Sequence, residues 1–239
     1  GKAGAVEYRQ ASWLNFLGFL AFAVIMICLP NQHREGKTSG AIRLNREVWI
    51  TSGLAFLEFF FLITFSTNIA MHLSGALEEN STVSGILTGA FSGIQIVAGF
   101  ILEYITKWTG KLTLSAAMLS FSIGACFLIL FPSSLPMLFT GALFCGFSQG
   151  IFIPTGMVNV ANAVDTTSCA MASAVFTCAM SLGQFLSPTI LNKATGTLLG
   201  EITTGNVFII AAFGMAISAF LAALWKLSSN QKLYKGGLR

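Results

Sequence analysis

Seven apolar stretches, each long enough to cross a lipid bilayer, divide this chain. A membrane-spanning helix needs about 20 apolar residues, because each residue adds about 1.5 Å to its length. Mostly short polar segments separate the stretches, so we expect helices that run back and forth across one membrane. The expected spans are 12–30, 48–71, 84–106, 112–131, 135–158, 169–191 and 205–226.

Composition agrees with this pattern. Of the 239 residues, 54% are hydrophobic and only 9% are charged, whereas a soluble domain carries about 25% charged residues. The predicted fold class is therefore all-α integral membrane. The five cysteines lie in or beside apolar stretches and there are only two histidines, so we expect no disulfide framework, no metal site and no cofactor.

The longest polar segment separates the first stretch from the other six. This segment, 31–47, contains Arg34, Lys37, Arg43 and Arg46. The later connections are short, so the last six helices should form one compact bundle. We expect three parts, namely a single transmembrane helix in 1–30, a cytoplasmic linker in 31–47, and a six-helix bundle with a basic tail in 48–239.

Basic residues in the loops predict the orientation, because Lys and Arg accumulate on the cytoplasmic side of a membrane. If the N-terminus is outside, then of the 13 lysines and arginines all except Lys2, Arg9 and Lys193 lie inside. The opposite orientation reverses this bias. We therefore expect a multi-pass protein of the cell membrane with its N-terminus outside and its C-terminus in the cytoplasm.

Glycines gather on one side of the third stretch. At 100° per residue, Gly85, Gly89 and Gly93 lie on the same side as Glu103, and branched residues such as Ile94 lie opposite. In a bilayer, glycines let a neighbouring helix approach closely. We expect the glycine face to pack against protein and the branched face to meet lipid or a bulky partner.

Glu58 is the only acidic residue in the middle of a predicted span. A charge at the centre of a bilayer costs about 2.5–3.5 kcal/mol, and such residues usually face a cavity or a partner. Phe61 and Phe65 lie nearby on the same helix, and a carboxylate bordered by aromatic rings suits a proton or a cation. A second interpretation stays open, in which Glu58 is protonated and hydrogen-bonded to a neighbouring helix purely for packing.

The fifth and sixth stretches carry features that are unusual in plain apolar helices. Gly146 and Gly150 form a small-xxx-small pair around Gln149, and Pro154 follows. A proline break persists in a bilayer only where protein or a water-filled cavity satisfies the freed backbone groups. In the sixth stretch Gln184 shares an arc with several serines and threonines, which line either a cavity or a hydrogen-bonded helix interface.

The order of these features resembles the major facilitator superfamily. The sequence RQASWL, 9–14, and the apolar run after it look like the sixth helix of that family, and the basic linker is similar to its central loop. GALFCGFSQGIFIP and SLGQFLSP look like its tenth and eleventh helices, in the style of bacterial drug and small-molecule exporters. An acidic-then-basic motif between helices eight and nine is similar to Glu103, Lys107, Gly110 and Lys111.

The resemblance implies a fold and a mechanism. Two six-helix halves rock about a central site, driven by a proton or solute gradient, and this chain corresponds to the second half preceded by the last helix of the first. The implied partners are the bilayer, a small-molecule substrate with proton coupling and the missing N-terminal half, with no nucleic acid. For substrate or proton coupling the candidates are Glu58, Phe61, Phe65, Gln149 and Gln184. For gating they are Glu103, Lys107, Gly110 and Lys111, and for helix packing Gly85, Gly89, Gly93, Gly146, Gly150 and Pro154.

Two other classes of membrane protein remain as alternatives. A seven-helix receptor has the same topology, but the last span, 205–226, has no mid-membrane lysine for a chromophore, and the linker sets the first helix apart. A scaffold that does not transport is the other alternative. An enzyme is the least expected class, because no set of nucleophile, base and orienting residue is visible.

Overall fold

The computed structural model describes Val24, residues 43–76 and residues 81–236, with side chains in 43–73 and 83–228. The chain separates into two compact units, Gly1–Ala41 and Ile42–Arg239. All the helices described below belong to the second unit. Apart from Val24, the predicted first span lies outside the described residues, as does most of the linker.

Every predicted stretch from the second onward coincides with a helix, and the described part of the chain contains no strand. Except for α4, the helices end later than the apolar patterns suggest. In the sixth stretch, for example, the helix continues beyond residue 191 to Leu199, and there the hydroxyls of Thr195 and Thr197 donate to the carbonyls of Leu191 and Lys193, four residues back. The elements are α2 (Arg46–Ala76), α3 (Ser81–Thr109), η1 (Gly110–Leu112), α4 (Thr113–Leu130), α5 (Leu135–Asn162), α6 (Cys169–Leu199) and α7 (Thr204–Gly236).

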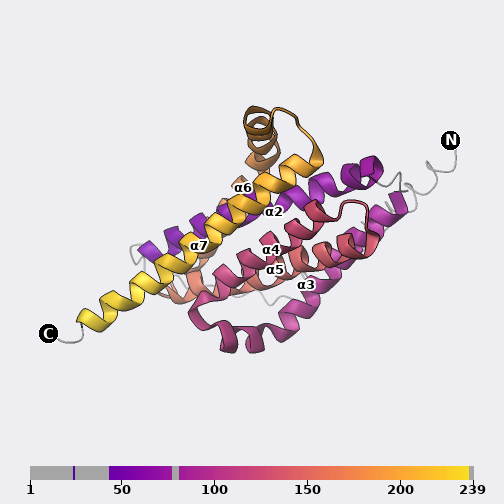
Figure 1. Ribbon diagram of the computed structural model, residues 1–239. Helices are drawn as coiled ribbons and strands as arrows, with labels where there is room; N and C mark the ends of the chain where they lie inside the picture. Colours follow the sequence, from indigo (N-terminus) through magenta and orange to yellow (C-terminus); the bar gives the residue numbers. More distant parts are fainter. Residues whose placement is uncertain (1–23, 25–42, 77–80, 237–239) are drawn as a thin grey trace. The chain divides into compact units, whose positions relative to one another are not determined.

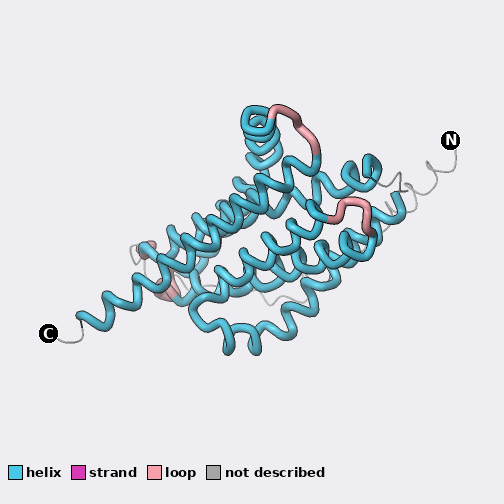
Figure 2. The backbone as a smooth tube through the Cα atoms, in the orientation of Figure 1, coloured by secondary structure: helices cyan, strands magenta, loops and turns pink. Residues whose placement is uncertain are grey.

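Five segments of the described chain are long and apolar enough to cross a membrane. The longest, Val83–Leu130, contains both α3 and α4. Between these two helices the chain turns back at η1 (Figure 2), where Gly110 has a φ of 54°. Glycine adopts this left-handed conformation without the steric cost that a side chain adds. The prediction of an all-α protein with several membrane-spanning helices is thus confirmed.

Most of the buried apolar side chains form one core, and a smaller second cluster contains Phe60, Leu191 and Val207. In Figure 1, α4 lies beside α5, and the contacts also join α2 to α6, α3 to α5 and α4 to α7. The largest side chains at the centre are completely buried and come from five different helices, namely Phe65, Phe121, Phe152, Phe176 and Phe208. Burial of rings from so many elements makes the second unit one packed body.

Within the described unit the glycine face of α3 has no packing partner, so the prediction that it packs against protein stays a prediction. Gly85, Gly89 and Gly93 are exposed, and a Cβ atom added at any of them would meet nothing within 4 Å. The opposite face packs inward instead, with Leu87 and Ala98 completely buried. The reason lies in α5, whose own glycines already provide the small surface against which the branched face of α3 can pack.

Candidate functional site

Glu58 is completely enclosed between helices. It lies in the middle of α2, and the hydroxyl of Ser148 on α5 donates a hydrogen bond to its Oε1 atom at 2.7 Å. Ser148 is also completely buried. Glu58 Oε2 has no hydrogen-bond partner among the described residues. The two carboxyl oxygens therefore have different surroundings.

The face of α2 that carries Glu58 is polar and buried along its length. Thr51, Glu58, Phe65 and His72 follow one another at a spacing of seven, and all four are buried. The ring of His72 lies 3.0 Å from the hydroxyl of Thr204, measured from Nδ1 to Oγ1. Among the buried side-chain atoms that lack a hydrogen-bond partner in the described structure, all except Thr155 Oγ1 belong to α2. This helix therefore concentrates the unsatisfied polar groups of the bundle, and such groups call for a physical explanation.

The two phenylalanines predicted to accompany Glu58 pack against other helices. Phe65 stacks on Phe91 of α3, with 4.7 Å between ring centroids. Phe61 is half-buried and lies against Gly214 of α7, where an added Cβ atom would collide with its ring. These rings therefore connect α2 to α3 and to α7.

Gln149 takes part in the contact between α3 and α5. Gln95 of α3 donates to its side-chain carbonyl at 3.0 Å. On either side, Gly146 and Gly150 lie directly against the backbone of α3, and a Cβ atom at Gly150 would be 2.8 Å from the carbonyl oxygen of Gln95. Gln184 is exposed on α6, so the structure does not bring it into the enclosed site of Glu58.

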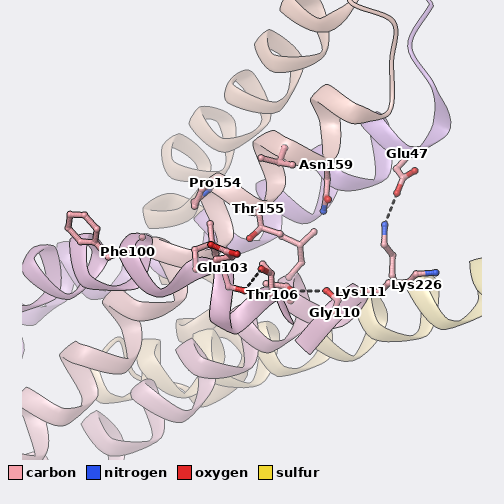
Figure 3. A pocket seen from close by; sticks show the side chains of 15 residues that line it. Glu47, Phe100, Glu103, Thr106, Gly110, Lys111, Pro154, Thr155, Asn159 and Lys226 are labelled. Carbon is pink, nitrogen blue, oxygen red and sulfur yellow. Dashed lines mark hydrogen bonds and ion pairs between the residues drawn. The ribbon is translucent and has the colours of Figure 1, made fainter. Parts of the chain in front are cut away.

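A cavity of about 920 Å³ lies where α3 ends and α4 begins (Figure 3). Its wall combines the last turns of α3, the η1 turn and the second half of α5, and includes Glu47 of α2 and Lys226 of α7. Phe100 contributes an apolar surface, and Glu103 and Asn159 contribute polar ones. The cavity can therefore hold a molecule that has both polar and apolar parts.

The residues of the predicted gating motif lie at this cavity or next to it. Glu103 and Lys107 form an ion pair at 2.8 Å with largely exposed side chains. Glu103, Gly110 and Lys111 line the cavity. Sequence reasoning did not predict the second ion pair here, from Lys226 to Glu47 at 2.6 Å, because its partners are 179 residues apart.

In the described helices, the two interior prolines both border cavities. Pro154 lines the large cavity, beside Thr155, whose buried hydroxyl has no partner among the described residues. Pro188 of α6 lines a second cavity of about 190 Å³ together with Asn68 and Ser187. This is the setting expected for a proline inside a membrane, since the freed backbone groups lie near space that water can enter.

The comparisons with known proteins agree with this arrangement. The family profile of the Major Facilitator Superfamily matches residues 48–235, which include most of α2 and α7 and everything between them. No curated protein and no solved structure gives a match. Among the described residues no group of three His, Cys, Asp or Glu side chains could hold a metal ion. With more than half of its length matched, the chain is a multi-pass membrane protein that belongs to the Major Facilitator Superfamily, a family of transporters.

Proposed function

We propose that this protein serves secondary active transport of a small molecule by alternating access, as an exporter of the cell membrane. The observation that carries the proposal is the family match over 48–235, the same region that forms one packed core. In alternating access two bundles move against each other around a site near the middle of the membrane. Helices α2–α7 act as one of these bundles, and an N-terminal six-helix half acts as the other.

The orientation follows from the basic residues. With the C-terminus in the cytoplasm, the η1 turn and the large cavity lie at the cytoplasmic end of the bundle. Lys107, Lys111 and Lys226 then all lie near that surface, as the excess of basic residues on the inside requires. We assign the gating role to Glu103, Lys107, Gly110 and Lys111, since they connect α3 and α4 at the edge of this cavity.

Coupling to protons is assigned to Glu58. A carboxyl that is completely buried in mid-membrane is stable there when neutral and costly when charged, so a change in its surroundings drives proton uptake or release. One hydrogen bond to α5 leaves its second oxygen available for that exchange.

Substitution of Glu58 tests this proposal. In the complete carrier, reconstituted in lipid vesicles, Glu58→Gln should abolish transport driven by a pH gradient while the yield of folded protein stays nearly unchanged. Transport is measured as efflux of the cationic dye ethidium. Efflux of a neutral dye and of an anionic dye is measured in parallel for comparison. Glu58→Asp should keep part of the activity with an altered pH dependence.

A pure packing role predicts the reverse pattern. Gln would keep the hydrogen bond to Ser148 and transport normally, whereas Glu58→Ala would lower the yield of folded protein. A fully active Gln variant with unchanged pH dependence would remove Glu58 from the mechanism.

A further inference from the structure

We propose that Ser148 is a positioning residue for Glu58. The hydroxyl of Ser148 holds carboxyl oxygen Oε1 of Glu58, so that proton exchange takes place at Oε2. The inference rests on the coupling role proposed above. It assigns a function to a side chain that no motif singles out. Its basis is the only hydrogen bond found for Glu58 in the described structure, between two completely buried residues on different helices.

The helical segment around Ser148 is held from several sides. Gly146 lies against the carbonyl of Phe91, and Gly150 lies against the backbone of Gln95, so α5 sits directly on α3 at both points. Cys145, on the preceding turn, faces the carbonyl of Phe121 on α4 with its sulfur 4.0 Å from the oxygen. Contacts to α3 and α4 therefore fix Ser148 in place while its hydroxyl points to α2.

Among the described residues, Glu58 has no competing partner that could take over this role. The titratable group beside it is the buried thiol of Cys145, which is a weak hydrogen-bond donor and already faces Phe121. His72 lies about four turns further along α2 and is paired with Thr204. Glu47, near the start of α2, is paired with Lys226. Ser148 is thus the group that distinguishes the two oxygens of Glu58.

The chemistry follows from that distinction. Because Oε1 accepts the hydroxyl proton of Ser148 in a hydrogen bond, it keeps carbonyl character in the protonated acid. In proton uptake an O–H bond of a hydronium ion breaks, leaving water, and a lone pair of Oε2 forms the new O–H bond. In release the O–H bond of Oε2 breaks, its electron pair stays on Oε2, and a lone pair of water takes the proton. A hydrogen bond that stays on Oε1 keeps the exchanging oxygen the same in every cycle.

Infrared spectroscopy of the full chain in lipid vesicles tests the inference without a substrate. The C=O stretching band of protonated Glu58 is identified as the band that Glu58→Gln removes, at a pH where exposed carboxyls are ionised. In Ser148→Ala this band should move to higher frequency, because the carbonyl loses its donor. If Glu58 is ionised at that pH, its carboxylate stretching bands provide the same comparison.

Two further variants make the result specific. Ser122→Ala removes another buried interhelical serine bond, to the carbonyl of Ala212, and should leave the Glu58 band unmoved. Ser148→Cys keeps a weak donor and nearly the same volume, so it should give a smaller displacement. If Ser148→Ala does not fold, the displacement of the Glu58 band in Ser148→Cys tests the inference in its place.

Transport by the complete carrier supplies the second readout. Ser148→Ala should displace the pH profile of ethidium efflux, whereas Ser122→Ala should not. A Glu58 band that is the same in wild type, Ser148→Ala and Ser148→Cys would overturn the inference even if Glu58→Gln stops transport. A displaced band together with a fully active Glu58→Gln variant would instead show that the proposed coupling has failed. The two failures are therefore distinguishable.

Discussion

The two halves of α5 form opposite kinds of environment. Before Pro154 the helix is pressed against its neighbours, with Gly146 and Gly150 on the backbone of α3 and Ser148 bonded to the enclosed Glu58. After Pro154 the same helix lines a cavity of about 920 Å³. The first region contains one carboxyl with one donor, and the second contains several charged side chains in ion pairs or beside open space.

The comparison shows how one helix can serve both rigidity and access. Small residues let α3 and α5 touch, which protects a buried polar contact from water. A proline removes one backbone hydrogen bond of the helix, and this local break favours open space beside the part of α5 that follows it. The transport mechanism proposed above uses both properties, a fixed contact at the proton-coupling carboxyl and a cavity for the solute.

The largest effect should come from a bulky side chain at Gly146, in the half of α5 before Pro154, where the helix touches α3. Gly146→Leu places a branched side chain where a Cβ atom already collides with the carbonyl of Phe91, so we expect loss of most folded protein. Gly89→Leu is the matched control, because the same change on α3 meets open space within the described unit. The measurement is the folded fraction by size-exclusion chromatography in detergent after mild heating.

Equal losses from both substitutions would contradict this difference between the glycines of α5 and those of α3. If Gly89→Leu alone lowered the yield, the exposed face of α3 would be the stronger packing surface. The helix wheel predicted that face as a packing surface, and the described structure leaves it open.

The open glycine face of α3 shows what the sequence can and cannot determine. Stretch lengths and composition predict the helices, because a span must be about 20 apolar residues long. The wheel groups Gly85, Gly89 and Gly93 on one face, but it does not say which helix is the neighbour. Likewise the apolar position of Glu58 marks it as unusual, whereas its donor Ser148 is 90 residues away and no local pattern connects them.

An intermediate effect is expected at the proline that separates the two regions. Pro154→Ala restores a backbone N–H that can bond to the carbonyl of Gly150, so α5 should straighten and narrow the cavity. A cysteine placed at Asn159, in a background without native cysteines, reports access to the cavity through labelling by a water-soluble maleimide. Pro154→Ala should slow this labelling severalfold, while thermal stability stays the same or rises.

Pro136→Ala is the control, since this proline occupies the first turn of α5, where its missing donor leaves no intrahelical bond unmade. Unchanged labelling in Pro154→Ala would mean that the proline does not keep the cavity open.

The smallest effect concerns the two ion pairs at the open end. The side chains of Glu103 and Lys107 are 77% and 65% exposed, so Lys107→Met should change the free energy of unfolding by less than about 0.5 kcal/mol. Those of Lys226 and Glu47 are 20% and 39% exposed, and this pair links α7 to α2, so Lys226→Met should cost about 1 kcal/mol. The midpoint of unfolding in a graded denaturing detergent, with and without added salt, measures both. Salt should reduce the small contribution of the exposed pair further and affect the partly buried pair less. Equal costs for the two substitutions, with equal salt dependence, would show that Glu47 and Lys226 do not hold α2 and α7 together at this end of the bundle.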